Sequence, residues 1–161
     1  MMTLADYLNE HEREFQEREA QREALRAEWV QAVERLLQQI EQWVREADPK
    51  GRIRIERTVQ KDREQALGFF EVPRLILTYG TERVEVVAWA RFVVGGIKRT
   101  ADGAEERIQG SVHIANGSDK VSLYRLIGPP GDEWFVDNQS EPGTTRFTRE
   151  CFDTLLLSLI K

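Results

Sequence analysis

Two histidines and one cysteine are the residues of this chain best suited to hold a metal or to act as a nucleophile. His11 and His113 have no Cys, Asp or Glu at a metal-ligand spacing on a matching element. Cys151 lies at the expected start of a helix, where the helix dipole would lower the pKa of the thiol, but Phe and Leu residues follow it. We therefore expect no metal site, no cofactor and a structural role for Cys151.

Three carboxylates flank Trp134 and are the main candidates for acid–base chemistry. Asp132 and Glu133 precede the tryptophan, and Asp137 follows it. A pair of carboxylates held close together can serve as general acid and general base. Carboxylates at strand ends are also common without any function, so the sequence assigns no catalytic residue here.

Basic residues occur in two stretches that could bind an anion. Gly95-Gly96-Ile97-Lys98-Arg99 lacks the spacing of a phosphate-binding loop, and no helix start follows it. The region 52–63 is basic, but its polar face carries no aromatic residues that could stack on nucleic acid bases. We expect solvated surface in both stretches and no nucleic acid partner, while anion binding at either stays open.

The element that must organise these residues is a helix over residues 3–47. This stretch contains no Gly and no Pro and is rich in Glu, Gln, Arg, Ala and Leu. Thr3 and Asp6 have the spacing of a capping box, and Asp48-Pro49-Lys50-Gly51 ends the helix. Such a helix would be about 67 Å long, roughly twice the diameter of the remaining domain. Half of it must be covered by something else or stand in water.

The apolar pattern predicts which half of the helix is buried. From Leu25 onward apolar residues recur every three or four positions, a stripe wide enough to pack on a sheet. The stripe consists of Leu25, Trp29, Val33, Leu36, Leu37, Ile40, Trp43, Val44 and Ala47. We therefore divide the chain into a protruding arm, residues 1–24, and a single domain, residues 25–161.

The arm carries fewer apolar residues, on one face. They are Leu4, Tyr7, Leu8 and Phe15, and the next positions of the same seam are Arg18 and Arg22. These six residues are the predicted interaction surface, for a protein partner or for a second copy of the chain in a homodimer. The alternative is a solvated helix held by pairs such as Arg13 with Glu17 and Glu14 with Arg18.

The charge of the chain is concentrated on the helix. The net charge is −5 over 161 residues, but residues 1–48 hold twelve acidic residues against six Arg. An acidic helix repels phosphate backbones, which again argues against nucleic acid. No apolar run has the length of a membrane span or the form of a standard export signal, so we expect a soluble, cytoplasmic protein that is not membrane-bound. The single cysteine agrees with a reducing compartment.

Residues 53–136 alternate in the manner of antiparallel strands. Strands are predicted at 53–59, 66–72, 75–79, 83–94, 107–115, 120–127 and 133–136, with a turn at 61–64. Pro73 cannot donate to a ladder, so its strand either ends there or runs along an edge of the sheet. A last helix begins after Thr148 and buries Phe152, Leu155, Leu156 and Leu159. Short connections leave no room for parallel crossovers, so the fold class is α+β: a long helix packed on an antiparallel sheet of six or seven strands, with a short C-terminal helix.

Two packing predictions can be made from these strands. A four-residue loop over 116–119 would pair Ile114 with Val121, Val112 with Leu123 and Ile108 with Ile127, which keeps the apolar faces aligned. The strand 83–94 is apolar on both faces, which predicts a covered sheet with Trp89 in the core beneath Trp43.

The sequence as a whole favours a non-enzymatic protein-interaction or adaptor module that presents its acidic arm to a partner. A narrower version is an acidic inhibitor or immunity-type protein, motivated by charge. The alternative is a small-ligand-binding domain or small enzyme with a pocket between the sheet and the C-terminal helix. That pocket would use Trp89, Arg91, Lys98 or Asp137.

Overall fold

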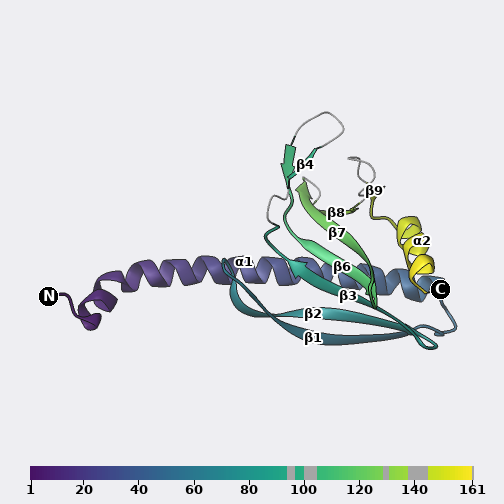
Figure 1. Cartoon of the computed structure of the whole chain (residues 1–161), viewed down its shortest axis with the longest axis horizontal. Helices are drawn as coiled ribbons and strands as arrows, with labels where there is room; N and C mark the ends of the chain where they lie inside the picture. Colours follow the sequence, from purple (N-terminus) through teal and green to yellow (C-terminus); the bar gives the residue numbers. More distant parts are fainter. Residues whose placement is uncertain (94–96, 100–104, 129–130, 138–144, 161) are drawn as a thin grey trace.

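The computed structural model describes residues 1–93, 97–99, 105–128, 131–137 and 145–160, with the backbone alone at 97–99 and 105–106. It is an α+β fold, as the sequence predicts: one long N-terminal helix, a seven-stranded antiparallel sheet and a short C-terminal helix (Figure 1). The helix α1, Leu4–Ala47, crosses one face of the curved sheet, and its N-terminal part extends well beyond the sheet. The helix α2, Arg149–Leu159, lies near the C-terminal end of α1.

The strands follow one another across the sheet almost in chain order. The order is β1 (Arg54–Glu64), β2 (Gly68–Tyr79), β3 (Glu82–Ala90), β6 (Ser111–Asn116), β7 (Asp119–Gly128), β8 (Gly131–Val136) and β9 (Thr145–Arg146), and every pair is antiparallel. Between β3 and β6 the chain forms a separate hairpin of β4 (Ile97–Arg99) and β5 (Glu105–Arg107). Gly95 and Gly96, which begin one of the two stretches considered for anion binding, lie outside the described residues.

The predicted bounds of α1 are confirmed because both ends carry local signals. The Thr3 hydroxyl accepts a hydrogen bond from the Asp6 amide at 3.2 Å, and the Asp6 carboxylate accepts one from the Thr3 amide at 3.0 Å. Asp48 caps the C-terminus, and its amide donates to the Val44 carbonyl at 2.9 Å. Among the described residues, no helix has both the length and the apolar character needed to span a membrane.

One apolar core lies between the sheet and the two helices. From α1 it takes Trp29, Ala32, Val33, Leu36, Leu37, Ile40 and Val44, and from α2 the four residues predicted, Phe152, Leu155, Leu156 and Leu159. Leu25 and Trp43 pack against this cluster but remain partly exposed, and Ala47 is exposed. The Thr148 hydroxyl accepts a hydrogen bond from the Cys151 amide at 3.3 Å, so the predicted cap of α2 is also confirmed.

The predicted register of the β6–β7 hairpin is confirmed at two of its three pairs. Val112 lies opposite Leu123 and Ile114 opposite Val121. The hairpin is closed more tightly than expected, because Asn116 and Asp119 pair with each other. The Ile108–Ile127 pair is wrong: the described ladder starts at Ser111, and Gln109 and Gly110 bond Arg125 in a shifted register.

In the first hairpin the predicted turn at 61–64 is wrong, whereas one of the two alternatives for Pro73, that its strand runs along an edge there, is confirmed. Residues 61–64, expected to form a turn, continue β1 to Glu64, and the chain turns at 65–67 instead. Pro73 lies within a continuous β2, opposite Val59 of β1. The ladder between β2 and β3 begins only at Leu75. On the β3 side, Pro73 therefore faces no strand that would need a hydrogen bond from a backbone amide, which proline lacks.

The expectation that the sheet is covered on both faces is wrong. β3 ends at Ala90, and its pairing with β6 shifts between Ala88 and Ala90, which places Trp89 in a β-bulge. Trp89 is 62% exposed and stacks on His113 of β6, with ring centroids 4.6 Å apart. Trp43 instead packs on Phe147 and Phe152, with centroids 5.5 and 5.8 Å apart. Among the described residues, only the face that carries α1 and α2 forms a core.

Candidate functional site

The arm of α1 exposes its apolar side chains on one face. Leu4, Tyr7, Leu8 and Phe15, all predicted as interaction residues, are 74, 51, 56 and 60% exposed. Exposed aliphatic and aromatic residues are ordinary when they are scattered, but here they recur at helical spacing along one stripe. The structure therefore brings the predicted apolar residues of the arm together on one open surface.

The same stripe continues into the two predicted arginines, and their environments differ. The Arg22 guanidinium donates to the Glu19 carboxylate at 3.0 Å, and both side chains are about one third exposed. Arg18 is exposed and has no ion-pair partner in the described part of the chain. The expected Arg13–Glu17 pair is present at 3.4 Å, whereas Glu14 pairs with His11 at 3.3 Å rather than with Arg18.

A shallow concave surface lies on this face of the arm. It has a volume of about 360 Å³ and is bordered by Tyr7, Leu8, Asn9, His11, Glu12, Glu14, Phe15 and Arg18. The rings of Tyr7 and His11 contact each other, with centroids 4.3 Å apart. The surface is partly apolar and partly charged, and its residues come from a single helix.

The arm leaves the body of the molecule where the tip of the first hairpin meets α1. The Arg26 guanidinium donates to the Leu67 carbonyl at 2.8 Å, between β1 and β2. Leu67 is fully buried, and Gly68 adopts a φ of 73° beside the same guanidinium. Arg26 thus closes the end of the core from which the arm extends.

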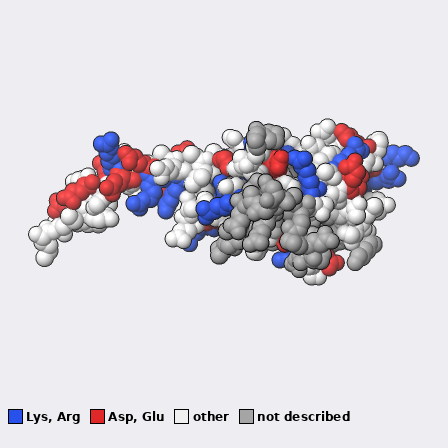
Figure 2. All heavy atoms as spheres, turned by 90° about the horizontal axis from the view of Figure 1, so that it is seen from above, with Lys and Arg blue, Asp and Glu red and all other residues white. Residues whose placement is uncertain are grey.

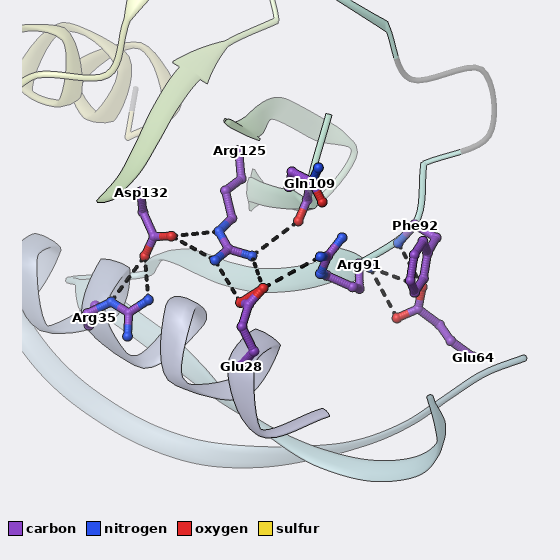
Figure 3. A network of polar contacts seen from close by, with 8 residues as sticks. All are labelled: Glu28, Arg35, Glu64, Arg91, Phe92, Gln109, Arg125 and Asp132. Carbon is purple, nitrogen blue, oxygen red and sulfur yellow. Dashed lines mark hydrogen bonds and ion pairs between the residues drawn. The ribbon is translucent and has the colours of Figure 1, made fainter. Parts of the chain in front are cut away.

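A second candidate site is a cluster of charged residues between α1 and the sheet, formed by Glu28, Arg35, Glu64, Arg91, Arg125 and Asp132 (Figure 3). At its centre the Arg125 guanidinium is only 2% exposed. It contacts Glu28 of α1 through two bonds of 3.0 and 2.7 Å, and Asp132 of β8 at 2.8 Å. It also donates to the Gln109 carbonyl at 3.3 Å. The cluster ties the helix to β7 and β8.

Two further arginines extend this cluster in opposite directions. Arg35 of α1 donates to the second oxygen of Asp132 at 3.0 and 2.6 Å. Arg91 is 6% exposed and lies 3.5 Å from Glu28, while its backbone amide donates to Glu64 at 3.0 Å. Each carboxylate already contacts a cation or amides, so the cluster holds elements together and offers no free general base.

The electrostatics of the cluster follow from this pairing. Burial alone would lower the pKa of Arg125, but hydrogen bonds to Glu28 and Asp132 outweigh it and raise that pKa. Burial would likewise raise the pKa of Asp132, but the Arg35 and Arg125 guanidiniums hold it below its ordinary value. Arg91 differs, because burial lowers its pKa and the attraction of Glu28 does not fully compensate.

The sequence contains one signal for this cluster. Arg125 follows Val121 and Leu123 in the inward-facing alternation of β7, where a charged residue is rare unless it is paired. Arg57 of β1 shows the same signal. It interrupts an apolar alternation because its guanidinium binds Glu34 and Glu41 of α1.

The carboxylates around Trp134 do not form a catalytic pair. Asp132 belongs to the Arg125 cluster, Glu133 pairs with Arg146 at 2.8 Å, and Asp137 accepts a hydrogen bond from the Tyr124 hydroxyl at 3.1 Å. Consecutive residues of a strand point to opposite faces, which separates Asp132 from Glu133. The possibility of a shared acid–base site at these carboxylates is therefore not realised.

The residues expected to line a pocket next to the C-terminal helix do not come together there. Trp89 stands on the open face of the sheet, Arg91 lies buried beside Glu28, and Asp137 contacts Tyr124. The side chain of Lys98 lies outside the described residues. A cavity of about 560 Å³ instead opens between α1 and β8–β9, lined by Arg35, Leu36, Gln39, Trp43, Gly131, Asp132, Glu133, Trp134, Arg146 and Phe147.

In the part of the chain that the structure describes, His11, His113 and Cys151 belong to no cluster of metal-ligating side chains. Within the described residues, no group of three or more His, Cys, Asp and Glu side chains is placed to hold a metal ion. Burial and the nearby Lys120 lower the pKa of His113, so its ring is neutral at pH 7. Burial raises the pKa of the Cys151 thiol, which opposes the reactive thiolate.

Comparisons of this chain with models of protein families, with curated proteins and with solved structures yield no match.

Proposed function

We propose that this protein is a non-enzymatic interaction module whose arm, residues 1–24, is the surface presented to a protein partner. The observation that carries the proposal is the exposure of Leu4, Tyr7, Leu8 and Phe15 on one face of the arm. Apolar surface of this kind gains free energy when another protein covers it. The body of the fold supplies a rigid support, because α1 continues from the arm directly into the core.

The Arg125 cluster supports this proposal by its position. It fixes α1 to β7 and β8 through Glu28 and Arg35. Glu28 lies only two residues beyond Arg26, where the first hairpin closes on the helix. An arm that projects from so firmly held a helix keeps a defined direction, which lowers the entropy cost of binding a partner.

A ligand-binding role stays a second candidate, favoured by the cavity between α1 and β8–β9. Its floor is aromatic, from Trp43, Trp134 and Phe147, and its rim carries the Arg35–Asp132 and Arg146–Glu133 ion pairs. Its guanidiniums are already paired, so an anionic ligand would have to displace a carboxylate. For that reason we place the arm first.

The test is site-specific photo-cross-linking in cells that naturally make the protein. A photoreactive residue at position 8 lies on the exposed apolar stripe, whereas one at position 13 lies on the opposite face, where Arg13 is 91% exposed. We expect a defined cross-linked protein from position 8 and none from position 13. Identical products from both faces, or no product from position 8, would contradict the proposal.

A further inference from the structure

The seam positions by which α1 packs on the sheet continue into the arm, although Arg18 and Arg22 separate the apolar residues of the arm from those of the body. In the body they include Leu25, Trp29, Ala32 and Leu36. In the arm they continue as Leu4, Leu8, His11, Phe15, Arg18 and Arg22, with alternating spacings of four and three. This alternation is the heptad spacing by which one helix packs along another. The geometry of the arm therefore fits a helix rather than a strand or an irregular loop.

The residues that flank this seam decide what kind of helix fits it. In the heptad pattern the flanking positions of the arm are Ala5, Glu12 and Glu19 on one side and Tyr7, Glu14 and Gln21 on the other. Three of the six are acidic and none is basic. Glu12 has no ion-pair partner in the described part of the chain, and it borders the concave surface between Leu8 and Phe15.

A second copy of the chain is a poor match for these flanks. In a parallel pair of arms, Glu14 of one copy would face Glu19 of the other. In an antiparallel pair, the flank that carries Glu12 and Glu19 would face its own equivalent. Residues 1–24 also contain seven acidic residues against three Arg. Figure 2 shows acidic side chains along much of the arm, with basic side chains both among them and nearer the body. Like charges that face each other across a helix pair weaken it.

We infer that the arm binds a basic amphipathic helix of a protein partner. This inference rests on the proposed function and specifies the chemistry of the partner. The partner helix has apolar residues along its seam, which cover Leu4, Leu8 and Phe15. It carries Lys or Arg at the flanking positions, where they meet Glu12, unpaired within the described residues, and also Glu14 and Glu19, which already contact His11 and Arg22 of the arm. Opposite Arg18, the exposed seam arginine without an ion-pair partner, it carries an acidic residue or a small polar one.

The experiment measures binding of fluorescent synthetic helices to the full-length protein. Each probe has about four heptads, enough for stable helicity. The first carries Leu at the seam and Lys at the flanks, the second carries Leu and Glu, and the third has the composition of the first with the seam scrambled. We expect the first to bind with an affinity that falls as salt is added. The second and third should bind at least about tenfold more weakly, a difference of some 1.4 kcal/mol.

Two pairs of variants of the protein make the test specific. Leu8→Gln and Phe15→Gln, which keep a good helix former at each position, should each weaken binding of the Lys-flanked helix about tenfold. Glu12→Lys with Glu14→Lys should reverse the preference toward the Glu-flanked helix. The matched control, Glu10→Lys with Glu17→Lys, changes net charge equally but lies away from the seam, and it should leave the preference unchanged.

Three outcomes would overturn the inference. Equal binding of the scrambled probe would show attraction by charge alone. A dimer of the full chain that Leu8→Gln dissociates in sedimentation would make the second copy the occupant. Failure of the Lys-flanked helix to bind would exclude a basic helix as the partner. If position 8 nevertheless gave a cross-linked protein, the proposed function would stand and only the chemistry assigned to the partner would be wrong.

Discussion

Arg125 of β7 and Glu28 of α1 lie 97 positions apart in the sequence and form a two-bond ion pair of 3.0 and 2.7 Å. The arginine is 2% exposed, whereas the glutamate side chain keeps 37% exposure. The pair joins the helix to β7 close to the point where the arm begins.

Arg125→Met should destabilise the protein by about 3 kcal/mol, the lower end of the cost of breaking a buried ion pair. The change leaves Glu28 with Arg91 alone and Asp132 with Arg35 alone. Urea denaturation measures the loss. Arg54→Met removes an exposed ion pair with Glu56 and serves as the control, with an expected change within about 0.5 kcal/mol. Equal effects of the two variants would show that the cluster contributes no special stability.

Acid should weaken the fold partly through Asp132. Because Arg35 and Arg125 depress the pKa of this carboxyl in the folded state, its stabilising contribution is present above the unfolded pKa of about 3.9 and is lost as pH falls through the lower folded value. We expect Asp132→Asn to reduce the slope of unfolding free energy against pH below about pH 4. Asp6 and Asp48, whose pKa values are also lowered, keep part of that slope. An unchanged slope in the variant would contradict this assignment.

Gly110 is required by its contact with Trp29. A Cβ atom at this position would lie 2.6 Å from Cη2 of the fully buried indole, and the φ of 149° disfavours other residues. Gly110→Ala should therefore cost more than about 2 kcal/mol through overpacking and backbone strain together. Gly117 has a φ of 60°, but an added Cβ atom there would meet nothing within 4 Å. Gly117→Ala therefore measures the backbone effect alone, at about 1 kcal/mol. Thermal or urea unfolding of both variants gives the comparison.

Trp43 and Trp89 should respond differently to truncation. Trp43 packs edge-on against Phe147 and beside Phe152, so Trp43→Ala should cost about 3 kcal/mol. Trp89 stands on the open face and touches His113 and Lys120, so Trp89→Ala should cost no more than about 1 kcal/mol. Similar losses in the two variants, measured by chemical denaturation, would mean that the outer face of the sheet contributes as much stability as the core.

The arm should be dispensable for folding. Its apolar residues are exposed in the monomer and therefore contribute little to the stability of the fold. Deletion of residues 1–24 should leave the melting temperature within a few degrees. Leu25 and Arg26, which contact the body, are retained. Differential scanning calorimetry of the full and shortened chains measures the change. Failure of the shortened chain to fold would show that the arm stabilises the body.

The sequence by itself determined the helices and the register of the central hairpin. Thr3 with Asp6 and Asp48 with Pro49 mark the ends of α1, and Thr148 marks the start of α2. Val112 and Leu123 were paired because a slip of one residue would turn the apolar side chains away from the core. These signals are local: caps lie within a few residues of the amides they bind, and a hairpin joins neighbours in the chain.

Only the tertiary structure decided the faces of the sheet and the Arg125 cluster. A strand that is apolar on both sides does not reveal whether a second layer exists, so Trp89 was predicted in the core although it lies on an open face. The sequence left open whether the strand of Pro73 ends there or runs along an edge, because it does not show where the neighbouring strand ends. The partners of Arg125 come from α1 and β8, and the distances that make a buried arginine stable arise only when the sheet and helix pack together.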